Sequence, residues 1–177
     1  MKATGIIRRI DNLGRVVIPK EICRSMRIKD GDALKLYTTD DGEVIFKKYS
    51  HLEVVVDLAQ QLVESMAKST DFITAITDKD AIIAVTECAK RDLLGKPITP
   101  EVESIMNSRC CYHHGKQNYV YISAPNRYLV TTAVPILSMG EVIGVVLCIG
   151  DSNNANYDAE YMMAETVSNF LAKQVSL

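Results

Sequence analysis

The sequence predicts an α+β protein in which a helix joins two domains. Three observations support this prediction. Residues 1–50 hold 11 Lys or Arg against 7 Asp or Glu, a net charge of +4, whereas residues 51–177 hold 9 against 15, a net charge of −6. Short β-prone runs fill the first fifty residues, and strand pairs alternate with amphipathic helices in the remainder. The two parts of the chain therefore differ in fold and in expected partners.

Residues 1–50 predict the element order ββαββ. The two turns are Asp11-Asn12-Leu13-Gly14 and Asp41-Gly42, both rich in turn-forming residues. Pro19 suits the first turn of a helix, because its missing N–H needs no partner there. The predicted elements are strands at residues 2–10 and 15–18, a helix at 19–26, and strands that contain residues 34–36 and 44–46. So few large apolar side chains make a poor core for one chain, and we expect burial against a second copy.

The predicted helix at residues 19–26 places cations along one face. Lys20, Arg24 and Arg27 are spaced i, i+4, i+7, while Ile22 and Met26 lie together on the other side. Such a face, on a segment with a net positive charge, indicates binding to a polyanion such as nucleic acid. A solvated surface with clustered charge remains the alternative that charge alone leaves open.

Residues 51–68 predict one amphipathic helix without Pro or Gly, which we expect to act as a stiff connector. Residues 69–177 predict a sensor-type α/β domain with an antiparallel sheet and helices packed beside it. Its expected elements are strands at 72–77 and 81–86, a helix at 99–108, an irregular region at 110–118, strands at 128–137 and 141–149, and a helix at 158–174. The predicted domains are thus 1–50, the connecting helix 51–68, and 69–177.

The run MKATGIIRRIDNLGRVVIPKEI at residues 1–22 resembles the AbrB family of transition-state regulators. The resemblance continues through Gly31-Asp32, then Gly42-Glu43-Val44-Ile45 and Lys47-Lys48-Tyr49, so it covers essentially the whole first domain. It implies a swapped-hairpin β-barrel dimer that binds double-stranded DNA.

Within this resemblance, the family's main DNA contacts map onto Arg8, Arg15 and Arg24. Guanidinium groups bind phosphates or base edges bidentately, and a two-fold dimer presents each of them twice. Phosphate contacts are also expected from a second set of cations, namely Lys2, Arg9, Lys20 and Arg27. The family pattern has a further arginine immediately before Arg24, where this chain has Cys23, so the resemblance implies one DNA-binding side chain fewer in each subunit.

The order of helices and strands after residue 50 resembles that of a GAF domain. Short segments, such as Ala133-Val134-Pro135-Ile136 and Gly144-Val145-Val146, add to this resemblance. An AbrB-like domain joined to a GAF domain implies a regulator of late sporulation genes that both activates and represses, and a homotetramer with contacts between the helices that flank the GAF domain. The GAF resemblance also implies a pocket for an unknown small ligand near residues 72–80, 99–118 and 128–134. A GAF domain that only dimerises stays open as the alternative.

The string Cys110-Cys111-Tyr112-His113-His114 brings thiols and imidazoles together. Adjacent cysteines do not easily reach one tetrahedral ion with adjacent histidines, so we predict no metal site. Redox chemistry of the two thiols stays open. No cysteine has a recognisable activating partner in the sequence, so we predict no catalytic residue, no enzyme activity and no cofactor.

Composition indicates a cytoplasmic, nucleoid-associated protein without membrane contact. The chain has 177 residues and is 47% hydrophobic, which suffices for an ordinary core, and no apolar run approaches a membrane span or a secretory signal. The five cysteines are irregularly spaced, which argues against a disulfide framework. An antitoxin-type DNA-binding autoregulator stays open, because swapped-hairpin domains also occur in toxin–antitoxin pairs. The large folded second part disfavours it, since an antitoxin's C-terminal part is typically a disordered tail.

Overall fold

The computed structural model describes residues 5–115, 119–124, 127–150 and 156–176. Contacts within the chain divide it into two compact units, Met1–Tyr49 and Ser50–Leu177, which we call the first unit and the second unit. The division falls at residue 50, which also separates the part of the sequence with a positive net charge from the part with a negative net charge. Within the described ranges, none of the helices combines the length and apolar character that crossing a membrane requires.

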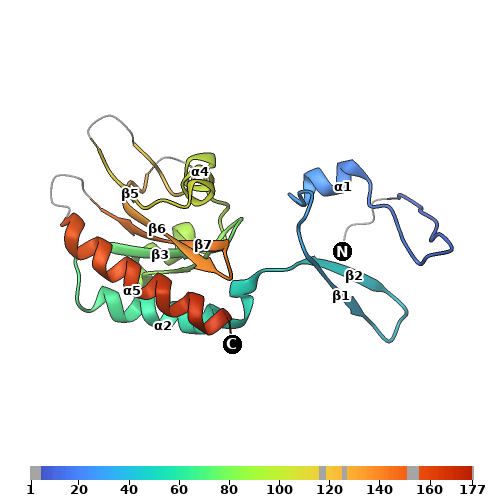
Figure 1. Cartoon of the computed structure of the whole chain (residues 1–177), viewed down its shortest axis with the longest axis horizontal. Helices are drawn as coiled ribbons and strands as arrows, with labels where there is room; N and C mark the ends of the chain where they lie inside the picture. The colour runs from blue at the N-terminus through green and yellow to red at the C-terminus, as the bar shows by residue number, and fades with distance from the viewer. Residues whose placement is uncertain (1–4, 116–118, 125–126, 151–155, 177) are drawn as a thin grey trace. The chain divides into compact units, whose positions relative to one another are not determined.

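The first unit contains one short helix and one hairpin (Figure 1). α1 spans Lys20–Ser25, and β1 (Leu34–Thr38) pairs antiparallel with β2 (Val44–Lys48). The turn between the strands closes where the backbone N–H of Thr39 donates to the carbonyl of Glu43 at 3.1 Å. Gly42 sits in this turn with a φ of 81°, a conformation that favours glycine. The predicted helix and the predicted second hairpin are confirmed.

Residues 5–19 differ from the prediction, because they form no strand in the single chain. Of the hairpin expected from strands at 2–10 and 15–18, the described residues form only the turn at 11–14, where the N–H of Gly14 donates to the carbonyl of Asp11 at 3.1 Å. A strand needs a neighbouring strand to satisfy its backbone groups, and the described part of one chain supplies none here. Large apolar side chains consequently stay exposed, namely Ile6, Ile7, Ile10, Leu13, Val16 and Val17.

The second unit is built on a five-stranded antiparallel sheet with the order β4-β3-β7-β6-β5. Its strands are β3 (Ile73–Thr77), β4 (Ile82–Val85), β5 (Tyr112–His113), β6 (Val130–Ser138) and β7 (Glu141–Ile149). The two predicted strand pairs are confirmed as β3–β4 and β6–β7. The short edge strand β5 lies in the region that was expected to be irregular. β7 pairs with both β3 and β6, so it forms the buried centre of the sheet.

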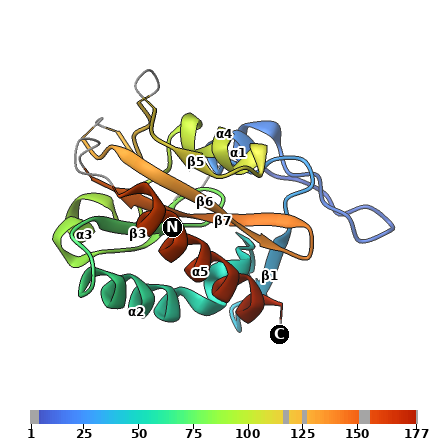
Figure 2. The same ribbon diagram turned by 60° about the vertical axis from the view of Figure 1, so that its left-hand side comes forward.

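Helices cover both faces of this sheet (Figures 1 and 2). The 3-10 helix η1 (His51–Val55), α2 (Val56–Ala67) and α5 (Tyr157–Val175) pack on one face. α3 (Glu87–Leu93) and α4 (Pro100–Ser108) pack on the other. The helices predicted at 99–108 and 158–174 are confirmed as α4 and α5, whereas α3 was not predicted. The unit therefore has two core layers separated by one sheet.

Residues 51–67 pack on the sheet of the second unit, although their sequence pattern predicts a connector between domains. Their apolar side chains are buried in the same core layer as those of α5, namely Leu52, Val55, Ala59, Val63 and Met66. An amphipathic helix needs a partner for its apolar face, and here the sheet and α5 supply it. By its contacts this helix belongs to the second unit.

Gly144 on β7 allows the backbone of β3 and the side chain of Leu52 to approach closely. A Cβ atom at this position would lie 2.7 Å from Cδ1 of Leu52 and closer still to the carbonyl oxygen of Thr77. Both neighbours are fully buried and cannot withdraw without disturbing the core. Glycine is therefore required here for packing.

Gly144→Ala is expected to lower the free energy of unfolding by about 1–3 kcal/mol, because the added methyl group overpacks the core. The measurement is denaturant unfolding of the full chain. Gly115→Ala is the control, since no atom lies within 4 Å of its Cβ position, and it should change stability by less than about 0.5 kcal/mol. Equal stability of the two variants would contradict the packing described for Gly144.

Candidate nucleic-acid interface

Six of the seven cations expected to contact DNA lie exposed on the first unit. They are Arg8, Arg9, Arg15, Lys20, Arg24 and Arg27, and the seventh, Lys2, lies outside the described residues. An exposed cation keeps its N–H donors available to an incoming anion. Arg8 and Arg9 stand in the segment before the turn, Arg15 follows the turn, and the others lie on or after α1.

Lys20 and Arg24 lie one turn apart on α1 and share a face. Arg24 stands in the last turn of the helix, where a cation complements the partial negative charge of the helix end. Arg27 follows the helix with a φ of 52°, and its N–H donates to the carbonyl of Arg24 at 3.2 Å. The predicted i, i+7 alignment of Arg27 is therefore wrong, because the helix ends at Ser25 and Arg27 has a left-handed backbone conformation.

Arg15 is held against the turn by Asp11. Oδ2 of Asp11 accepts a hydrogen bond from Nε of Arg15 at 2.8 Å, and Oδ1 accepts from the backbone N–H groups of Leu13 and Arg15, each at 2.9 Å. These bonds, chiefly that from the Arg15 backbone, lower the pKa of Asp11 below its usual 3.8. The Arg15 side chain is still 71% exposed, so the outer edge of its guanidinium group can reach a phosphate.

Lys48 has a structural role that its sequence context does not indicate. Its Nζ lies 3.0 Å from Oδ2 of Asp32 and donates to the carbonyl of Arg27 at 3.1 Å. The Lys48 and Asp32 side chains are only 21% and 17% exposed. The pair ties β2 to the chain after α1 and so fixes the backbone at Arg27. No sequence pattern signals it, since the two residues lie on different elements.

Cys23, which replaces an arginine of the AbrB pattern, turns partly into the unit. Its Sγ lies 4.0 Å from the carbonyl oxygen of Ile18, and the residue is half-buried while its neighbour Arg24 is exposed. The thiol adds neither a charge nor a strong hydrogen-bond donor to the exposed surface.

The string from Cys110 to His114 lies at the edge of the sheet in the second unit. Cys110 and Cys111 are exposed free thiols. Nδ1 of His113 lies 3.5 Å from Oγ1 of Thr132, whose hydroxyl donates to the buried carboxylate of Glu160 at 2.7 Å. Across the residues that the structure describes, no cluster of three or more His, Cys, Asp or Glu side chains could hold a metal ion.

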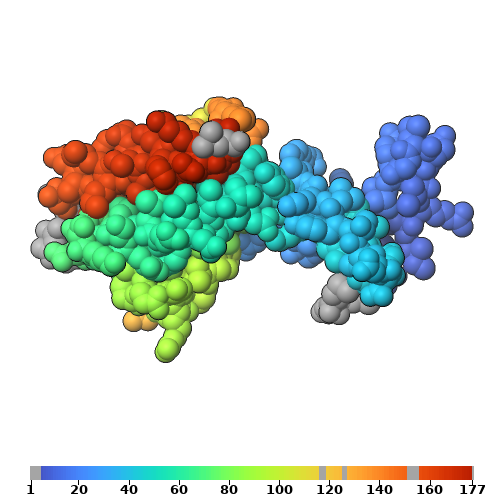
Figure 3. All heavy atoms as spheres, turned by 90° about the horizontal axis from the view of Figure 1, so that it is seen from below, coloured from blue at the N-terminus to red at the C-terminus, as the bar shows by residue number. Residues whose placement is uncertain are grey.

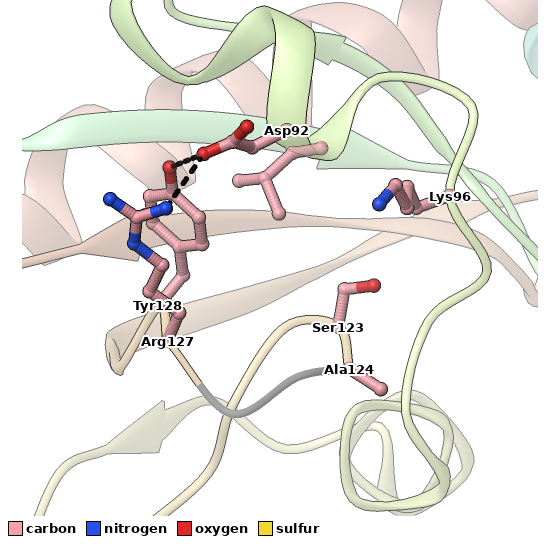
Figure 4. A pocket seen from close by; sticks show the side chains of 7 residues that line it. Asp92, Lys96, Ser123, Ala124, Arg127 and Tyr128 are labelled. Carbon is pink, nitrogen blue, oxygen red and sulfur yellow. Dashed lines mark hydrogen bonds and ion pairs between the residues drawn. The ribbon is translucent and has the colours of Figure 1, made fainter.

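A second candidate site is a pocket of about 180 Å³ in the second unit (Figure 4). It is lined by Asp92, Leu93, Lys96, Ser123, Ala124, Arg127 and Tyr128. Of the three segments expected to form a ligand pocket, only 128–134 contributes, through Tyr128. The remaining lining comes from α3, the loop after it and the loop before β6. Two signals could have revealed α3, namely Thr86 before its first residue and Gly95 shortly after its last.

The carboxyl group of Asp11 is expected to titrate below 3.8 in a carboxyl-detected NMR titration. Because its pKa is lowered in the folded chain, the ionised group stabilises the turn above the unfolded pKa, and this contribution disappears as pH falls through the folded pKa. Arg15→Met should raise the pKa only part of the way, since the backbone N–H of residue 15 still donates. A wild-type pKa at or above 3.8 would contradict this geometry.

Two family models match the chain. Residues 55–176 match "Stage V sporulation protein T C-terminal, transcription factor", and residues 7–52 match "Antidote-toxin recognition MazE, bacterial antitoxin". Stage V sporulation protein T of Bacillus subtilis (strain 168) is 38% identical over 180 residues, which cover 99% of each chain. Transition state regulatory protein AbrB of the same organism is 55% identical over 49 residues, 28% of this chain and 50% of its own length.

Solved structures resemble the fold at low sequence identity. A GAF domain/HD domain protein from Geobacter sulfurreducens matches with a TM-score of 0.50 and 20% identity, over 73% of this chain and 97% of its own. A type II free methionine-R-sulfoxide reductase from Thermoplasma acidophilum matches with a TM-score of 0.51 and 13% identity, over 71% and 95%. These likenesses show a GAF-like fold alone. The similarity that spans the whole chain and the model that matches residues 55–176 show that this chain belongs to the family of stage V sporulation protein T.

Proposed function

We propose that this chain is a sequence-specific DNA-binding regulator of transcription in sporulation, which binds duplex DNA through a dimer of its first unit. The observation that carries the proposal is the array of exposed cations on the first unit, in a chain from a family of transcription factors. Such an array neutralises phosphates and releases counterions, which supplies much of the affinity for DNA. The negative charge of the second unit limits unspecific adhesion of the whole chain.

A second chain completes the first unit in this proposal. Ile7 and Val17 are 89% and 74% exposed, which is unusual for side chains that a fifty-residue domain needs as core. In a swapped-hairpin dimer, residues 5–18 of each chain pair with strands of the other chain. The exchange gives their backbone groups partners and buries their apolar side chains in the same step.

Within this dimer, Arg8, Arg15 and Arg24 are the proposed main contacts to DNA. Asp11 holds Nε of Arg15 and so reduces the side-chain entropy cost of binding. Lys2, Arg9, Lys20 and Arg27 are proposed to contact phosphates only, which positions the dimer without selecting a base sequence.

α5 offers a second interface, through which two dimers would form a homotetramer. α2 and α5 lie side by side on one face of the second unit (Figure 3). The exposed side of α5 carries Asp158, Met162, Thr166, Asn169, Phe170 and Lys173. When two copies of α5 pack antiparallel about Thr166, Met162 faces Phe170 of the partner subunit, and Asp158 lies one residue from the position that faces Lys173 of the partner subunit. Apolar contacts at the centre and opposite charges at both ends make this surface self-complementary.

The second unit would regulate DNA binding through the chain at residue 51. η1 directly follows the first unit in sequence, and Leu52 on it is fully buried in the core layer of α2 and α5. A ligand or a change of assembly that shifts this layer would therefore move the attachment of the first unit. The proposal assigns no reaction to the second unit.

An antitoxin-type autoregulator is the second candidate, favoured by the match of residues 7–52 to an antitoxin family model. The second unit argues against it, because among its described residues 29 buried hydrophobic ones form a core, where a toxin-wrapping tail would be exposed. Co-purification of the chain with a small toxin at fixed stoichiometry would favour this candidate over the first.

Arg8→Ala, Arg15→Ala and Arg24→Ala are each expected to weaken binding to operator DNA about tenfold or more. Removing a cation that neutralises one phosphate should flatten the log–log salt dependence by about 0.9 for each subunit of the dimer. Fluorescence anisotropy at several salt concentrations measures both quantities. Lys35→Ala, an exposed cation on β1 outside the proposed set, is the control. Variants that all match wild type in affinity and slope would overturn the assignment.

Phe170→Glu is expected to convert tetramers into dimers, because it buries an uncompensated charge at the centre of the α5 interface. Light scattering after size-exclusion chromatography measures the mass. Leu94→Glu is the control, since Leu94 is 41% exposed at the end of α3, which packs on the face of the sheet opposite to α5. A tetramer that survives Phe170→Glu would exclude α5 as the second interface.

A further inference from the structure

The lining of the pocket in Figure 4 combines charged side chains with apolar ones. Leu93 at the end of α3 lines the pocket and is 2% exposed. Asp92, Arg127 and Tyr128 stand together on one wall, while the amino group of Lys96 points into the pocket from the opposite wall (Figure 4). A ligand in this space would meet an ammonium group at one end and apolar surface along its length.

The carboxylate of Asp92 already accepts hydrogen bonds from two side chains of the pocket. Oδ2 of Asp92 accepts a hydrogen bond from the hydroxyl of Tyr128 at 2.7 Å and one from Nη1 of Arg127 at 3.3 Å. The first bond raises the pKa of Tyr128, because Asp92 holds the phenolic proton. Lys96 has no hydrogen bond or ion pair from its side chain within the described part of the chain. The pocket thus carries two cations and one anion, in a unit whose net charge is −6.

The walls are held in place by the protein itself. Gly95, with a φ of 75°, turns the chain after α3, and its N–H donates to the carbonyl of Ile82 at 2.8 Å. The N–H of Ile82 in turn donates to the carbonyl of Lys96 at 3.0 Å. Across the pocket, the hydroxyl of Ser123 donates to the carbonyl of Pro97 at 3.2 Å. A pocket whose walls are cross-linked in this way loses little conformational entropy when a ligand binds.

We propose that this pocket binds a small monocarboxylate with a short apolar body. Lys96 binds the carboxylate, the outer nitrogens of Arg127 provide further donors, and Leu93, Ala124 and the ring of Tyr128 contact the body. A volume of about 180 Å³ is smaller than that of pockets for drug-sized molecules, which limits the ligand to a few heavy atoms.

Phosphate fits this site less well than a monocarboxylate. A phosphate needs several converging donors, and the hydroxyl hydrogen of Ser123 is already used on Pro97. One free ammonium group matches a single negative charge, and the buried Leu93 side chain favours a partner with apolar surface. Binding at this site is measured without DNA, so its outcome is independent of the DNA-binding proposal.

The test uses the full chain with isovalerate as the probe. Isovaleramide has nearly the same shape without the charge, and inorganic phosphate tests the general affinity for anions. Isothermal titration and thermal unfolding should show that isovalerate binds and raises Tm, while the amide and phosphate do not. Lys96→Met should weaken isovalerate binding about tenfold or more, with an unchanged Tm in the absence of the probe.

Two further variants keep the result decisive. Lys96→Arg retains the charge and should keep most of the affinity. Lys68→Met removes an exposed lysine at the end of α2, outside the pocket, and should bind isovalerate as wild type does. Absence of isovalerate binding, equal binding of the amide, tighter binding of phosphate, or unchanged affinity in Lys96→Met would overturn the proposal.

Discussion

Burial of the apolar side chains at residues 5–17 is the constraint on which the DNA-binding part of the molecule depends. A single chain leaves these side chains exposed to water. Burying one Ile or Val side chain stabilises the folded state by about 1.5–3 kcal/mol. The same segment carries Arg8, Arg9 and Arg15, so whatever buries the isoleucines also fixes the position of these cations. The proposed dimerisation would therefore also position the cations that are proposed to bind DNA.

The sheet of the second unit separates two surfaces with different chemistry. On one face, α5 presents the surface that we propose for assembly. On the other, α3 and the loop before β6 enclose a small pocket with an excess of positive charge. β6 and β7 contribute buried residues to both core layers, so these two strands connect the pocket side of the sheet with the α5 side. The proposed ligand site and the proposed assembly surface are therefore connected through the same two strands.

Local patterns in the sequence were sufficient for the hairpins of the second unit, because short polar turns separate β-branched runs there. α3 was missed because only Ala89 and Leu93 on it are buried, which leaves too weak a periodicity. At residues 5–18 the β-propensity is genuine, but no partner strand exists among the described residues of the same chain. The pocket could not be predicted either, since the bond between Asp92 and Tyr128 joins elements 36 residues apart.

The most direct test of this account is hydrogen exchange of the backbone amides at residues 6–18 in the full chain, measured over a range of protein concentrations. The account predicts slow exchange for amides in both arms of the hairpin, together with a molecular mass of at least two chains, because a second chain supplies their hydrogen-bond acceptors. Exchange at the rate of an unstructured chain at every concentration would contradict it.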